Sequence, residues 1–214
     1  MKKLTFLLAA AALILAGCPD SSSHTRAVYM LLDTSGTYTA ELNKAQAIIN
    51  YLLGTLQPGD SLAVARIDTG SFSEKDIIKK ITFDGRPSVS TQQKRDFRDT
   101  IDKFVAEVKG SPYTDITGGI LQATETLYET GAGKKTILVF SDMEEDIKAG
   151  YVRDIPFNLQ GIEVVALNVT KLRGDIIDPR KFMTRLEEWK IKVEKGDGQW
   201  RVVNDLERLE RILQ

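Results

Sequence analysis

The sequence predicts an α/β fold in which a doubly wound, mostly parallel central sheet is flanked by helices on both faces. Short apolar runs of strand length alternate along the chain with longer segments whose apolar residues recur every three or four positions. The short runs are apolar at consecutive positions, which is typical of strands buried on both faces. Strands that are joined through helices form parallel sheets, and the alternation therefore predicts this class of fold.

The strands are predicted from these apolar runs. They are expected at 27–32, 61–67, 136–140, 163–169 and 200–203, with a weaker edge strand at 77–83. The run at 136–140 is the clearest, and it leads directly into Ser141 and Asp142.

The helices are predicted where apolar residues share one face. These faces are Leu42, Ala45, Ile49, Leu52 and Leu56 in the first helix, Phe97, Ile101, Phe104 and Val108 in the second, Ile116, Ile120, Ala123 and Leu127 in the third, and Phe182, Leu186 and Trp189 in the fourth. A turn is expected at 84–87. Asp178 and Pro179 are a good helix start for the fourth helix, and Asn204 is expected to cap a terminal helix that runs to Leu213.

The N-terminus carries the features of an export signal. Two lysines precede an uncharged, mostly aliphatic run at 4–15, which is shorter than the roughly 20 apolar residues that span a bilayer. The following Leu-Ala-Gly-Cys at 15–18 resembles the lipobox of bacterial lipoproteins. This resemblance implies cleavage before Cys18, lipidation of its thiol and acylation of the new N-terminus, which together give a stable membrane anchor. The alternative is a signal-anchor helix with an incidental cysteine.

The predicted organisation is therefore a lipoprotein signal peptide at 1–17, a lipidated N-terminus and tether at 18–26, and a single domain at 27–214. A fully extended tether would keep the domain within roughly 30 Å of the lipid surface. Pro19 and Asp20 lie where lipoproteins carry sorting information, and they favour the periplasmic face of the inner membrane over the outer membrane.

The composition excludes several classes of function. A formal net charge of −1 is the wrong balance for a protein that binds nucleic acid by neutralising phosphates. Cys18 and His24 are the only cysteine and the only histidine, so an internal disulfide, a cysteine-ligated zinc site and a cluster of imidazole ligands are all excluded.

Small hydroxylated and acidic residues lie after two of the predicted strands and before one of the predicted helices. Asp33, Ser35 and Thr37 follow the first strand, Thr114 precedes the third helix, and Asp142 follows the strand at 136–140. Ligands of open α/β sheets bind beyond the carboxyl ends of the strands, where such loops meet. Carboxylate and hydroxyl oxygens without imidazole or thiolate suit Mg²⁺, with Mn²⁺ as a substitute.

Together these residues resemble the metal-ion-dependent adhesion site of von Willebrand factor type A domains. The family pattern is Asp-x-Ser-x-Ser, a Thr and an Asp in three successive loops, and all five places are filled by Asp33, Ser35, Thr37, Thr114 and Asp142. The resemblance implies a Rossmann-like fold and a bound divalent cation whose shell is completed by a carboxylate of the partner. It implies metal-dependent association with another envelope or surface protein, and no catalysis.

Residues around the motif depart from the family pattern. Met143 and Tyr113 stand where glycine is frequent in relatives, and both are expected to narrow the approach to the ion or to make it more apolar. Asp115 and the acids at 144–146 are expected either to form an acidic rim that repels an acidic ligand or to be solvated surface residues.

Two other functions compete with this interpretation. A haloacid-dehalogenase-like phosphatase would use Asp33 as its nucleophile, with Asp142 and Asp146 nearby, but Ser35 stands where its general acid should be. The other alternative is a metal-free scaffold with a structural or interaction role.

Overall fold

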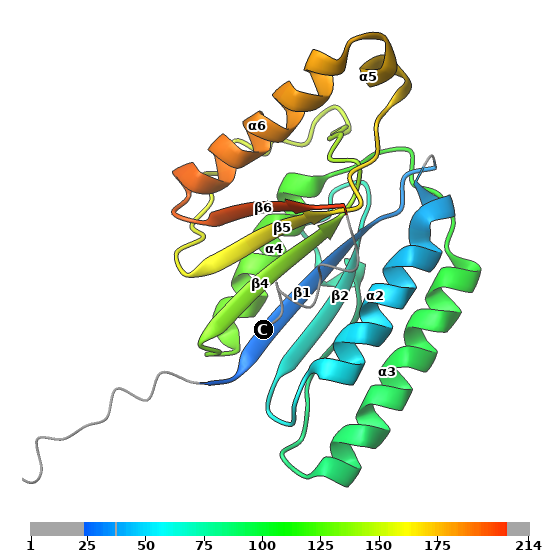
Figure 1. Cartoon of the computed structure of the whole chain (residues 1–214), viewed down its shortest axis with the longest axis vertical. Coiled ribbons are helices and arrows are strands. Elements are labelled where there is room, and N and C mark those ends of the chain that lie inside the picture. The colour runs from blue at the N-terminus through cyan, green and yellow to red at the C-terminus, as the bar shows by residue number, and fades with distance from the viewer. Residues whose placement is uncertain (1–23, 37, 205–214) are drawn as a thin grey trace, which may run out of the picture.

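The computed structural model describes residues 24–36 and 38–204, which form a six-stranded sheet with helices on both faces (Figure 1). Its strands are β1 (Arg26–Asp33), β2 (Ser61–Ile67), β3 (Ile77–Thr82), β4 (Lys134–Phe140), β5 (Ile162–Leu167) and β6 (Gln199–Val203). Its α-helices are α2 (Leu42–Thr55), α3 (Pro87–Glu107), α4 (Ile116–Glu129), α5 (Arg173–Ile177) and α6 (Pro179–Lys195), with single 3-10 turns at η2 (Thr39–Glu41) and η3 (Glu74–Asp76).

The strand order is β3-β2-β1-β4-β5-β6, and every pair is parallel except β2 with β3. The chain builds outward from β1 to β3, crosses back, and continues from β4 to β6. The order therefore reverses between β1 and β4, and ligands of doubly wound folds bind at this switch point. The predicted α/β class with a mostly parallel sheet is confirmed.

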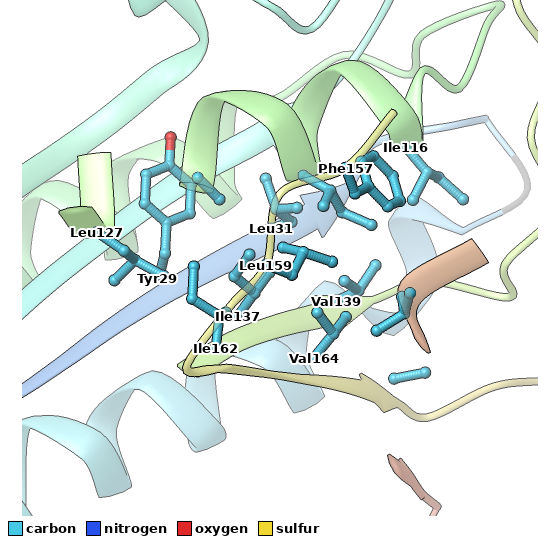
Figure 2. Packing of buried hydrophobic residues seen from close by; sticks show 14 of the residues in the cluster. Tyr29, Leu31, Ile116, Leu127, Ile137, Val139, Phe157, Leu159, Ile162 and Val164 are labelled. Atoms are coloured by element: carbon cyan, nitrogen blue, oxygen red, sulfur yellow. The ribbon is translucent and has the colours of Figure 1, made fainter. Parts of the chain in front are cut away.

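Alternate residues of β1 point to opposite faces of the sheet, and a separate core forms on each face. Val28, Met30 and Leu32 pack with α2 and α3, whereas Tyr29 and Leu31 pack with α4 and α6. Figure 2 shows the second core, in which labelled side chains of β1, β4 and β5 lie against those of α4 and the segment before β5.

The predicted strands and helices are found with shifted ends. The helix predicted from Phe97 begins ten residues earlier, at Pro87, which takes the first helical position after the turn. The strand predicted to reach residue 169 ends at Leu167, because Asn168 has a φ of +52°. The short α5 was not predicted. The predicted terminal helix after Asn204 lies outside the described residues.

Within the described part of the chain, no helix is both long enough and apolar enough to cross a membrane. Cys18 and the predicted signal peptide lie outside that part.

Candidate metal site

The three predicted loops meet above the carboxyl ends of β1 and β4, around a cavity of about 410 Å³. Three of the five predicted ligands, Ser35, Thr114 and Asp142, line it. The other lining residues are Gly36, Ser111, Pro112, Glu144, Asp146 and Leu172. Asp33 lies at the end of β1 beneath the loop that carries Ser35. Thr37 lies outside the described residues.

Asp33 links the first loop to the third. Its side chain is buried, and its two carboxylate oxygens accept hydrogen bonds from the Ser35 backbone N–H at 2.8 Å and from the Ser141 hydroxyl at 2.6 Å. Burial raises the pKa of Asp33, and these two hydrogen bonds only partly oppose that shift. The carboxylate is therefore held in a fixed orientation at the floor of the site.

Asp142 is the second buried carboxyl of the site. Its Oδ1 accepts a hydrogen bond from the Glu144 backbone N–H at 2.9 Å. Burial, assisted by the nearby charge of Asp33, raises the pKa of Asp142 to about 6, although the Glu144 N–H and the charge of Arg185 oppose this shift. Among the described residues, no lysine or arginine nitrogen lies within 4.0 Å of either carboxylate of this pair. Two buried carboxyls without a cationic partner fit a site that holds a metal ion.

Backbone hydrogen bonds fasten the second loop to its neighbours. Ser111 forms a parallel bridge with Ser35, in which the Ser111 N–H donates to the Thr34 carbonyl at 2.7 Å. Thr114 forms an antiparallel bridge with Asp146, with N–H···O distances of 2.9 and 3.0 Å. These bridges fix the spacing of the three loops, and the pattern of side chains in the sequence did not predict them.

Asp115 is not part of an acidic rim, contrary to the expectation from the sequence. It is 1% exposed and caps α4, because its Oδ1 accepts a hydrogen bond from the Gly118 N–H at 2.8 Å. Its other oxygen accepts from the Ser71 N–H at 3.0 Å and forms an ion pair with Arg153 at 2.6 Å. No sequence pattern indicates this pair, because Arg153 lies 38 positions away in an irregular segment.

Met143 and Tyr113 do not narrow the site. Neither side chain lines the cavity that contains Ser35, Thr114 and Asp142. Met143 has a φ of +64°, which explains why glycine suits this position, and its side chain is completely buried in the core beneath α6.

The donor atoms of the site suit a hard cation. The side chains of Asp33, Ser35, Thr114 and Asp142 offer only carboxylate and hydroxyl oxygens, which Mg²⁺ and Mn²⁺ accept. No group of three or more His, Cys, Asp or Glu side chains in the described part of the chain could hold a metal by itself. A metal at this site would therefore depend on the hydroxyl groups.

No protein-family model and no curated protein matches the sequence. Solved structures are similar in fold. The pilus adhesin SpaC from Lactobacillus rhamnosus GG, in an open conformation, superposes with a TM-score of 0.55 at 13% identity, covering 89% of this chain and 29% of that one. A von Willebrand factor type A protein from Catenulispora acidiphila gives a TM-score of 0.51 at 14% identity, covering 89% of this chain and 41% of that one.

The conserved hypothetical protein BatB from Bacteroides thetaiotaomicron gives a TM-score of 0.51 at 16% identity, covering 89% of this chain and 96% of that one. This chain thus spans less than half the length of the first two proteins and nearly the whole of the third. Together with the strand order and the layers of helices, these similarities show that the chain has the von Willebrand factor type A fold.

Proposed function

We propose that this protein is a lipid-anchored component of the bacterial envelope whose domain binds a divalent cation and, through it, another protein. The residues that would hold the ion are Asp33, Ser35, Thr37, Thr114 and Asp142. When bound, Mg²⁺ or Mn²⁺ would supply a positive charge that accepts a carboxylate of the partner. No bond is made or broken in this function, and we propose no catalysis.

One observation carries this proposal: Asp33 and Asp142 are buried beside hydroxyl groups at the topological switch point, and neither has an ion-pair partner among the described residues. A buried carboxylate without an ion-pair partner is costly, and buried charges in proteins are typically paired or coordinate a metal. The resemblance of the loops to the adhesion motif assigns the same residues independently. The phosphatase alternative lacks comparable support, because Ser35 stands where its general acid should be.

Isothermal titration of Mg²⁺ and Mn²⁺ into the purified, chelator-treated protein tests the proposal. We expect binding that Asp142→Ala removes and that Asp99→Ala retains, because Asp99 lies on α3 with a side chain 71% exposed. If the parent protein binds neither ion, the metal-free scaffold replaces this proposal.

The membrane anchor has a separate test. We expect the protein expressed in bacteria to fractionate with membranes and to carry acyl groups that mass spectrometry detects. Cys18→Ser should abolish both. Acylation that persists in this variant would contradict the assignment of Cys18.

A further inference from the structure

Helix α6 contacts the backbone of the third loop on both sides of Met143. The Arg185 guanidinium Nε donates a hydrogen bond to the Asp142 carbonyl at 3.1 Å, and the Trp189 indole Nε1 donates to the Met143 carbonyl at 2.9 Å. Both donors are well shielded, with Arg185 having a side chain 11% exposed and Trp189 being 6% exposed. Residues four apart on a helix lie on one face, so α6 offers these two donors side by side.

The two carbonyls belong to the peptide groups that flank the most constrained residue of the loop. Met143 has a φ of +64°, in the left-handed region that is sterically unfavourable for a residue with a side chain. Such a conformation persists only where the surroundings fix it. The hydrogen bonds from Arg185 and Trp189 provide this fixation, and they thereby set the direction in which Asp142 faces.

Arg185 is itself held in place by α5. Its Nη2 lies 2.6 Å from the Asp175 carboxylate, whose side chain is 2% exposed. Its Nη1 lies 3.1 Å from Glu144, the acid that lines the cavity two residues after Asp142. The guanidinium therefore binds the loop backbone with one nitrogen and draws the Glu144 carboxylate toward α6 with another.

The next acid of the loop is held in a similar way. The Glu145 carboxylate accepts hydrogen bonds from the Thr117 N–H at 2.6 Å and from the Thr117 hydroxyl at 2.9 Å. Lys192 of α6 lies 3.7 Å from the same carboxylate and donates to the Thr117 hydroxyl at 2.5 Å. Arg185, Trp189 and Lys192, which we call the α6 clamp, thus lie on one face of α6 and hold residues 142–145.

We propose that Arg185 and Trp189 are positioning residues of the metal site. They hold the loop so that Asp142 faces the ion, and Arg185 keeps Glu144 from competing with the partner's carboxylate. This inference rests on the proposed function, but the hold on the loop can be measured without metal. Supporting residues of this kind affect metal affinity by about 10- to 100-fold in known sites.

The experiment uses Glu144→Gln as its reference protein, because a Glu144 released from Arg185 would itself reach the ion and obscure the result. Arg185→Gln is added to this reference. The matched control adds Arg180→Gln, which removes an arginine of the same helix whose ion-pair partner among the described residues is Asp178, at the exposed start of α6. Trp189→Phe serves as a second variant, because it removes the indole donor and retains most of the packing.

Two quantities are measured. Hydrogen exchange in chelator follows the backbone amides of Met143, Glu144 and Asp146, all of which donate hydrogen bonds within the site, with β4 amides as the internal reference. Titration with Mg²⁺ alone gives the affinity. We expect Arg185→Gln and Trp189→Phe to accelerate exchange of the loop amides at least about tenfold and to weaken Mg²⁺ binding about tenfold, with β4 unchanged. Arg180→Gln should change neither quantity.

The two proposals fail separately. Unchanged loop exchange and Mg²⁺ affinity in both Arg185→Gln and Trp189→Phe would overturn the α6 clamp and leave the metal site standing. If the wild-type protein binds neither Mg²⁺ nor Mn²⁺, the proposed function is wrong and the positioning role falls with it. Faster hydrogen exchange of the loop amides in Arg185→Gln and Trp189→Phe, with the β4 amides unchanged, would then still show that α6 holds residues 142–145. If either variant does not fold, the other decides.

Discussion

The buried ion pair between Arg153 and Asp115 supports the second loop of the site, and Arg153→Met should destabilise the protein strongly. Three of its nitrogen–oxygen distances lie between 2.6 and 3.1 Å, and the Asp115 carboxylate is 1% exposed. Removing one partner of a buried pair typically costs about 3–5 kcal/mol, because the other charge is left without compensation. The N–H groups of Gly118, at the start of α4, and of Ser71 continue to donate to the Asp115 carboxylate. We therefore expect the free energy of unfolding to fall by about 3 kcal/mol, the lower end of this range.

Urea unfolding in chelator at neutral pH measures this loss. The double variant Arg153→Met with Asp115→Asn should recover at least about 2 kcal/mol of the single-variant losses, because no charge then remains buried. The control is Arg86→Met, which breaks an ion pair with Asp84 whose arginine side chain is 74% exposed, so the free energy of unfolding should change far less than in Arg153→Met. A loss below about 1 kcal/mol for Arg153→Met, or strictly additive losses, would refute the argument.

Three further predictions concern buried groups. Tyr29→Phe should stabilise the protein by up to about 1 kcal/mol in urea unfolding, because the completely buried Tyr29 hydroxyl has no hydrogen-bond partner among the described residues; a loss above about 1 kcal/mol would contradict this. As the pH falls from 7 to 5 in chelator, the free energy of unfolding should rise by about 1 kcal/mol more in the parent protein than in Asp142→Asn. The Asp142 carboxyl has a pKa of about 6 in the folded protein against an ordinary 3.8, so the folded protein binds the proton of this carboxyl more tightly than the unfolded chain does. Equal pH profiles of the two proteins would exclude this effect. Met143→Gly should cost about 2 kcal/mol by calorimetry, because the lost buried side chain outweighs the relieved backbone strain; increased stability would show the reverse.

The sequence predicted those parts of the fold that depend on local pattern. The central strands are apolar at consecutive positions, and α2, α4 and α6 each carry an apolar face. The first half of α3 was missed because residues 87–96 are mostly polar and exposed, and the helix is anchored through Phe97 and Ile101 further along. The five-residue α5 is too short to show a helical period.

The candidate site was predictable to the same extent. Ser35, Thr114 and Asp142 could be placed together because parallel strands deliver their following loops to one edge of the sheet. The residues that hold these side chains in place could not be predicted, since each of them acts through a contact between distant segments of the chain. Arg153 reaches Asp115 across 38 positions, and Arg185 reaches the Asp142 carbonyl across 43. No periodicity links such residues.

Residue 143 shows why the supports matter to the chemistry. Glycine would adopt the positive φ at this position without strain, but it would leave the loop free to sample other conformations. Methionine at the same position binds the loop to the core through its buried side chain, while Trp189 of α6 holds its carbonyl. The orientation of Asp142 thereby depends on the packing of α6 against the sheet. A displacement of α6 would therefore move the Arg185 and Trp189 donors that contact the loop carrying Asp142.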